Sequence, residues 1–347
     1  MTNPAADAHA ARRRVMWGTG FGLASAVGYT GANAFLREAS ILSDPVWVSC
    51  VKAVPTTILF VPVLLWQWAQ GNPPWTSRRA AAGLAVAGLL GQAVGNVSFQ
   101  YSLGVIGMAL SVPLCLGTLL FGTALLARLW LHEPVSTRSA VAMLVLLGAV
   151  VVLCFGAGDA HRAVQHAQAT THDGWAVGLA VTAACLSGFT YAFLGAVIRK
   201  AVTGNATLAA TLVVVSIVGL ASLGPMSYYR LGFEAMGATT WLQFRPMLLA
   251  GLFNAAAFYA LSKSLQLLPV LHYNLLNASQ TAFAAVAGVM FFEEPITPAL
   301  SLGVILTIVG LILMQGRSRR AAVITDDATP MLEPSERAHS ETAKAGH

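Results

Sequence analysis

Apolar segments of about 20 residues alternate with short polar stretches along most of the chain. Each segment ends where charged residues, Pro or Gly accumulate, and about 20 mostly apolar residues are what a helix needs to cross a bilayer. The third and fourth segments nearly abut, as do the eighth and ninth, which indicates tight helical hairpins. The pattern predicts ten transmembrane helices, at 15–36, 46–68, 80–101, 105–130, 137–156, 174–198, 207–228, 241–264, 267–292 and 297–315.

The first segment has a second interpretation. Arg12, Arg13 and Arg14 followed by an apolar run also fit a secretory signal peptide. An internal copy argues against removal of this segment, because Ser-Ala-Val-Gly-Tyr-Thr at 25–30 recurs as Cys-Leu-Ser-Gly-Phe-Thr at 185–190, an offset of 160 residues. We therefore expect the first segment to be a retained helix.

Composition argues against a soluble chain. Of the 347 residues, 56% are hydrophobic and 10% are charged, whereas soluble domains average about 25% charged. The formal net charge of +6 would fit nucleic acid binding, but Lys and Arg occur in short clusters between apolar runs, a pattern typical of membrane orientation. The expected partner is the lipid bilayer, and we expect no nucleic acid partner.

An internal duplication is the most specific signal. Trp-Leu-His-Glu-Pro-Val-Ser at 130–136 precedes the fifth segment, and Phe-Phe-Glu-Glu-Pro-Ile-Thr at 291–297 precedes the tenth. The aligned residues Glu133 and Glu294 are 161 positions apart. A further match pairs the third segment with the eighth at an offset of 158 residues, through Asn96 with Asn254 and Tyr101 with Tyr259.

Because each half holds five helices, an odd number, the second copy enters the membrane from the opposite face. The predicted fold class is therefore an all-α integral membrane protein, with ten helices in two inverted five-helix repeats. Inverted repeats around an in-plane axis are typical of secondary transporters, whose shared midplane cavity opens alternately to each side.

Positive charge predicts the orientation of this fold. With the N-terminus inside, 13 Lys and Arg residues at segment ends face the cytoplasm and four face outward, namely Arg37, Arg162, Arg230 and Arg245. We expect both termini to be cytoplasmic, in a multi-pass protein of the cell membrane. The expected parts are a cytoplasmic segment at 1–14, a first repeat at 15–156, an external loop at 157–173, a second repeat at 174–315 and a disordered tail at 316–347.

This arrangement resembles the drug/metabolite transporter superfamily in its ten-helix, EamA-like form. The resemblance covers about residues 15–315 and includes small residues in the first and sixth helices, the Asn–Tyr pairs, and the Glu-Pro junctions. A basic residue in the second helix also fits, although it is Lys52 where the family often has Arg. The resemblance implies a permease, usually an exporter, with a central cavity.

Polar side chains within apolar segments are the candidate solute-binding residues, because such groups are costly in hydrocarbon. Lys52 is the only charged residue well inside a predicted span. It either faces the cavity, where it would favour anionic or carboxylate-bearing solutes, or extends to the outer interface. The other candidates are Tyr29, Gln92, Asn96, Tyr191, Asn254, Tyr259, Tyr273, Asn277 and Gln280.

Each of these residues also has a structural interpretation. Amides such as Gln92 and Asn96 hydrogen-bond between helices in many membrane proteins, and the aromatic side chains are as well explained by packing. Energy coupling is weakly indicated, because no Asp or Glu lies inside a predicted span. His272 is a candidate for proton coupling, with a structural hydrogen bond as its alternative, so facilitated exchange and uniport both remain open.

The favoured function is export of small metabolites, such as amino acids or related compounds, with efflux of drugs or toxic compounds as the alternative. A membrane-embedded enzyme would need converging acids, bases or metal ligands, and the spans offer none; we expect no catalytic residue, metal or cofactor. Four Cys residues lack metal-ligand spacing, and there is no phosphate-binding loop for ATP. A sensor or scaffold that does not transport is the remaining rival. We expect a monomer or a weak homodimer.

Overall fold

The computed structural model describes residues 4–71, 78–131, 141–142, 144–145, 147–153, 155–156, 174–203, 206–268 and 270–315. All regular structure within these residues is helical, as the periodicity predicts. The Glu133 junction, the expected external loop and the expected disordered tail lie outside the described residues. The helices belong to one compact unit, Met1–Met314, and Gln315–His347 forms a second unit.

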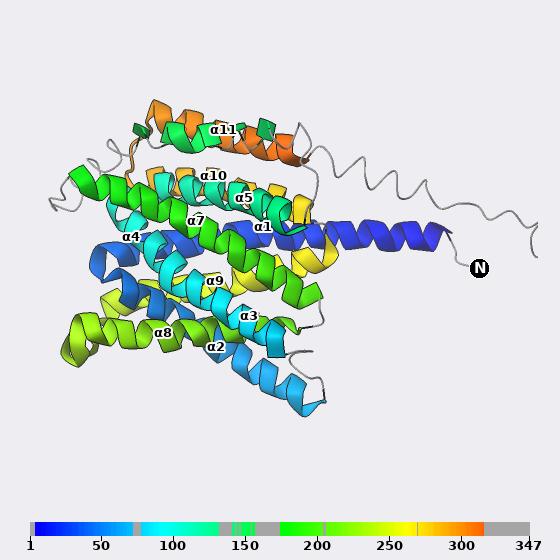
Figure 1. Cartoon of the computed structure of the whole chain (residues 1–347), viewed down its shortest axis with the longest axis horizontal. Helices are drawn as coiled ribbons and strands as arrows, with labels where there is room; N and C mark the ends of the chain where they lie inside the picture. Colours follow the sequence, from blue (N-terminus) through cyan, green and yellow to red (C-terminus); the bar gives the residue numbers. More distant parts are fainter. Residues whose placement is uncertain are drawn as a thin grey trace, which may run out of the picture. The chain divides into compact units, whose positions relative to one another are not determined.

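The helices follow the predicted segments in order along the chain (Figure 1), but the first helix and the helix that begins at Leu208 are longer than predicted. Residues described between 141 and 156, within the predicted fifth segment, are also helical. The named elements are α1 Pro4–Leu42, α2 Pro45–Ala69, α3 Arg78–Leu89, η1 Leu90–Asn96, α4 Val97–Ile106, α5 Met108–Leu131, α7 Gly174–Thr203, α8 Leu208–Gly237, α9 Trp241–Leu267, α10 Val270–Phe292 and α11 Pro298–Gln315.

Both predicted tight hairpins are confirmed. Gly107 alone separates α4 from α5, and its φ of 77° is a backbone conformation that favours glycine. Leu268 and residue 269 separate α9 from α10. Short connections of this kind join helices that are neighbours in the bundle.

Among the described residues, five helices are long and apolar enough to cross a membrane: Pro45–Ala69, Arg78–Ile106, Trp175–Ile198, Leu208–Gly237 and Trp241–Ser264. Met108–Thr123, Ser279–Phe292 and Pro298–Gly310 are shorter apolar helices. The long helix α1 is not in this group, because Gly, Thr, Tyr and Asn residues dilute its apolar content. The structure therefore supports several membrane spans without establishing all ten.

Helices that are distant in the sequence pack together. The first helix, α1, packs mainly on α9 and α10, while α7 packs mainly on α5 and on the α3–η1–α4 rod. In turn, α2 packs on α8 and α9, and α5 packs on α10. The start of α1 and the end of α11 lie at the same end of the bundle, opposite the α1–α2 connection (Figure 1).

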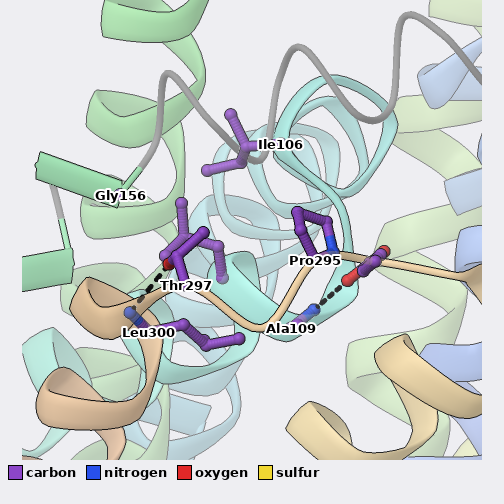
Figure 2. Close-up of a pocket in the computed structure, with 8 residues that line it drawn as sticks. Ile106, Ala109, Gly156, Pro295, Thr297 and Leu300 are labelled. Atoms are coloured by element: carbon purple, nitrogen blue, oxygen red, sulfur yellow. Dashed lines mark hydrogen bonds between the residues drawn. The ribbon is translucent and has the colours of Figure 1, made fainter.

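A buried ion pair near the end of α1 joins this helix to the connection between α10 and α11. Arg37 is 2% exposed and Glu294 is 6% exposed, and Arg37 Nε lies 3.2 Å from Glu294 Oε1. The same carboxylate accepts hydrogen bonds from the first backbone N–H groups of α5, from Met108 at 2.7 Å and from Ala109 at 2.6 Å. Figure 2 shows the bond to Ala109.

The carboxylate therefore compensates two positive groups at once. It balances the Arg37 guanidinium and caps the positively polarised N-terminus of α5, whose N–H groups have no partner within the helix. Two glycines provide the space, since a Cβ at Gly107 would lie 2.4 Å from Oε1 and one at Gly288 would lie 2.5 Å from Oε2.

We predict that Glu294→Gln destabilises the protein strongly. The substitution leaves the Arg37 guanidinium buried without a counter-charge, which typically costs about 3–5 kcal/mol. The measurement is thermal unfolding of the detergent-purified protein. The matched control is Glu293→Gln, because Glu293 is the exposed neighbour and surface substitutions usually change stability by less than about 0.5 kcal/mol. Equal effects of the two substitutions would contradict the structural role of Glu294.

Candidate functional site

Lys52 lies buried inside the bundle, on α2. It is 6% exposed, and it is seven residues from the start of the helix, which corresponds to about 10 Å along the axis at 1.5 Å per residue. Its Nζ donates a hydrogen bond of 2.8 Å to Asn96 Oδ1. The side chain therefore points inward to η1 and does not extend to the surface of the bundle.

Asn96 is the centre of a four-residue polar cluster. Its Oδ1 accepts a second hydrogen bond, from the hydroxyl of Tyr191 at 2.5 Å, and its Nδ2 donates to Gln92 Oε1. Gln92 Nε2 in turn donates to the backbone carbonyl of Val215 on α8, at 3.4 Å. We call Lys52, Gln92, Asn96 and Tyr191 the Lys52–Asn96 cluster.

The local backbone explains how this cluster forms. Gln92 and Asn96 both lie in η1, a π-helix, and single π-helical turns occur frequently at functional sites. Glycine allows α7 to approach this turn, because a Cβ at Gly95 would lie 2.5 Å from Thr190 Oγ1 and 3.0 Å from the Tyr191 ring. The small-residue spacing of Gly91 and Gly95 thus brings Tyr191 within reach of Asn96.

A second polar group lies on α10. Tyr273 and Gln280 are each 5% exposed, and Gln280 Nε2 donates to Asn277 Oδ1 at 3.3 Å. The hydroxyl of Tyr273 lies 3.5 Å from Ser25 Oγ on α1. Tyr29, also on α1, is half-buried and lies within electrostatic range of both Tyr273 and Tyr191. Tyr29 is therefore near one residue of the α10 group and one residue of the Lys52–Asn96 cluster.

The remaining sequence candidates have no described hydrogen bond to either group. Asn254 is half-buried in α9, and no hydrogen bond of its side chain is described. Tyr259 is 39% exposed and stacks on Phe60 with ring centroids 6.3 Å apart, so it does not join either group. The side chain of His272 lies outside what the structure describes. No described hydrogen bond joins Tyr259 or Asn254 to the Lys52–Asn96 cluster.

Three carboxylates of the described residues form ion pairs at or near the ends of helices. Asp44 pairs with Arg230 at 2.9 Å, and Glu38 pairs with Arg245 at 3.1 Å. Glu294 pairs with Arg37. In the part of the chain that the structure describes, no group of three or more His, Cys, Asp or Glu side chains is placed to hold a metal.

A small cavity lies beside the Glu294 cap, away from the Lys52–Asn96 cluster (Figure 2). Its volume of about 10 Å³ is at the lower limit for one water molecule. Ile106, Ala109, Pro295 and Leu300 are among its lining residues. The cavity is therefore part of the packing around the cap and is too small for an organic solute.

Residues 178–315 match the EamA-like transporter family. This stretch is similar to an EamA-like transporter domain. The match confirms the resemblance to the drug/metabolite transporter superfamily, and together with the apolar helices it identifies a multi-pass membrane protein. No curated protein matches the sequence significantly.

A solved structure described as "Crystal structure of protein" is similar to the chain with a TM-score of 0.59 and 14% sequence identity. The similarity covers 88% of this chain and 98% of that chain. At this identity the likeness concerns the fold alone. Because it covers most of the chain, the shared fold extends beyond the EamA-like domain into the first half, where Lys52 and Asn96 lie.

Sequence reasoning missed the Arg37–Glu294 pair. Both residues lie at the ends of predicted segments, whereas the structure buries Glu294 against α1 and α5. The duplicated Glu-Pro junction was visible in the sequence, but its partners were not, since Arg37 is 257 residues away along the chain. Gln100 is also buried. Its Nε2 donates a hydrogen bond of 2.7 Å to the Leu36 carbonyl, which links α4 to α1.

We predict that Gly95→Ala disrupts the Lys52–Asn96 cluster. The new Cβ would overlap Thr190 and Tyr191, and overpacking of this kind typically costs about 1–3 kcal/mol. Gly83→Ala is the control, because Gly83 lies on the same rod with nothing within 4 Å of its added Cβ. Thermal unfolding should show a lower midpoint for Gly95→Ala only. An unchanged midpoint for Gly95→Ala would mean that the helices do not approach so closely.

Proposed function

We propose that the chain is a secondary transporter of small metabolites, built from two inverted five-helix repeats around a midplane solute site. Export of amino acids or related compounds by alternating access is the specific function proposed. The observation that carries the proposal is the interleaved packing of the two halves around the Lys52–Asn96 cluster.

The main helix pairings support the inverted repeat. In the proposed repeat, α1 corresponds to α7, α2 to α8, the α3–η1–α4 rod to α9, and α5 to α10. Exchanging each element for its counterpart turns the pairing of α1 with α9 into that of α7 with the rod. The same exchange turns the α1–α10 pair into the α7–α5 pair. It turns the α2–α9 pair into the pair formed by α8 and the rod. The pairs α2–α8 and α5–α10 map onto themselves.

Contacts at one end of the bundle support the proposed orientation. The charge count places Arg37, Arg230 and Arg245 on the outer side, and all three pair with carboxylates at the end of α1 or next to it. Gln243 Nε2 also donates to the Leu42 carbonyl at 3.0 Å. Residues assigned to one side of the membrane thus meet at one end of the fold, with both termini proposed to be cytoplasmic.

We expect the two Glu-Pro junctions to lie on opposite sides of the membrane, because five helices separate them. The measurement uses Glu133→Cys and Glu293→Cys in a background without the native cysteines, labelled on intact cells with a membrane-impermeant maleimide. Cys at 293 should be labelled directly, and Cys at 133 only after permeabilisation. Labelling of both from the same side would overturn the inverted repeat.

We expect Asn96→Leu to reduce solute flux by tenfold or more. It removes the shared acceptor of Lys52 and Tyr191, and hydrogen bonds to charged groups contribute about 1.5–3 kcal/mol. The assay measures flux of radiolabelled amino acids and related metabolites in proteoliposomes, with and without a pH gradient. Thr182→Val is the control, because this exposed hydroxyl bonds to Gly178 within its own helix. Binding without flux in the wild type would indicate a sensor.

A further inference from the structure

We infer that Lys52 binds the carboxylate of the transported solute, so that the site selects organic anions over zwitterions and cations. This inference rests on the proposed function and narrows its substrates from amino acids to related carboxylates that carry no amino group. It is argued from three observations: the incomplete coordination of the Lys52 ammonium, the completeness of the surrounding network without it, and the apolar residue at the equivalent position of the other repeat.

The Lys52 ammonium has more donors than described acceptors. An ammonium carries three N–H donors, and the described residues provide one acceptor, Asn96 Oδ1. None of the carboxylates of Glu38, Asp44, Glu234, Glu293 or Glu294 forms an ion pair with it. A buried cation without a counter-charge is costly. A solute carboxylate supplies both the missing charge and the missing acceptors.

The surrounding network does not need Lys52 for its own hydrogen bonds. Asn96 Oδ1 also accepts from Tyr191, and Asn96 Nδ2 is bonded to Gln92. Removing the ammonium therefore leaves no buried acceptor of Asn96 unpaired. If the role of Lys52 were to complete this network, its removal would leave a buried acceptor without a hydrogen-bond donor.

The other repeat shows that the fold itself does not require a cation here. Asp44 and Thr207 are the N-caps of α2 and α8, and their side-chain oxygens accept from helix N–H groups. They are 163 residues apart, as are Pro62 and Pro225 inside the two helices. At this offset Lys52 corresponds to Val215, a buried apolar residue. The same place in the bundle is thus filled by valine.

The surroundings also explain selectivity by charge. An amino acid would bring an ammonium group as well as a carboxylate, and no described carboxylate lies free beside Lys52 to pair with it. The Tyr191 hydroxyl, which donates to Asn96, is a neutral group. A monoanionic carboxylate is therefore the solute whose charge this cluster balances.

The test measures ligand binding to the full-length, detergent-purified protein. Binding is detected as a rise in the thermal unfolding midpoint and quantified by titration with the ligand. Two series with similar carbon skeletons are used as probes, each running from anion to zwitterion to cation: 3-phenylpropionate, phenylalanine and phenethylamine, and butyrate, 4-aminobutyrate and butylamine. We expect the carboxylates without an amino group to stabilise the wild type most. Lys52→Met should weaken their binding about 10- to 100-fold, and Lys52→Arg should restore part of it.

The ligand-free variant gives a second readout. Because Lys52→Met removes an uncompensated buried charge, its unfolding midpoint without ligand should be unchanged or higher. Lys200→Met is the control for loss of a positive charge, since Lys200 is exposed at the end of α7, and it should bind the probes as the wild type does.

Three results would overturn the inference: stabilisation by the amines as large as that by the carboxylates, carboxylate binding that persists in Lys52→Met, or no stabilisation by any carboxylate in either series. A large fall in the ligand-free midpoint of Lys52→Met would also overturn it, because the lysine would then be structural. Carboxylate binding lost in Lys52→Met, with no flux in proteoliposomes, supports the anion site and overturns only the transport cycle.

Discussion

The Glu294 carboxylate is the constraint on which the connection between the two halves depends. It lies in the second half of the chain, and it neutralises Arg37 of α1 and caps α5, which both belong to the first half. In an apolar bundle such charges and N–H groups need partners within the protein, and this one carboxylate serves the Arg37 guanidinium and both N–H groups. Glycine at positions 107 and 288 leaves space for that carboxylate, since neither position has room for a Cβ.

With the halves joined in this way, the bundle can hold polar groups in its interior. The Lys52–Asn96 cluster draws its members from α2, η1 and α7, and close approach at Gly95 brings the last of these into place. Satisfied amide networks of this kind are compatible with simple helix packing. Lys52 is the exception, because its ammonium has a single described acceptor, and that imbalance is the basis for proposing a solute with a negative charge.

The proposed repeat makes the departures from symmetry informative. The packing of α1 on α9 has its counterpart in the packing of α7 on the α3–η1–α4 rod. Equivalent positions in the proposed repeats therefore have similar helix neighbours. Where the two repeats then differ in chemistry, as Lys52 differs from Val215, packing does not explain the difference. A cation in only one of the two proposed repeats is what a solute with a single charged end would require.

The sequence by itself determined the helical fold class, the tight hairpins at Gly107 and Leu268, and the polar residues from which the site is built. These are local properties, written in apolar runs about 20 residues long and in the residues that interrupt them. Only the tertiary structure decided that Arg37 and Glu294 are buried together, that Tyr191 reaches Asn96 while Tyr259 stacks on Phe60, and that Lys52 points inward. The physical reason is that each of these outcomes depends on contacts between helices far apart in the chain, and hydropathy along one segment carries no information about its partner.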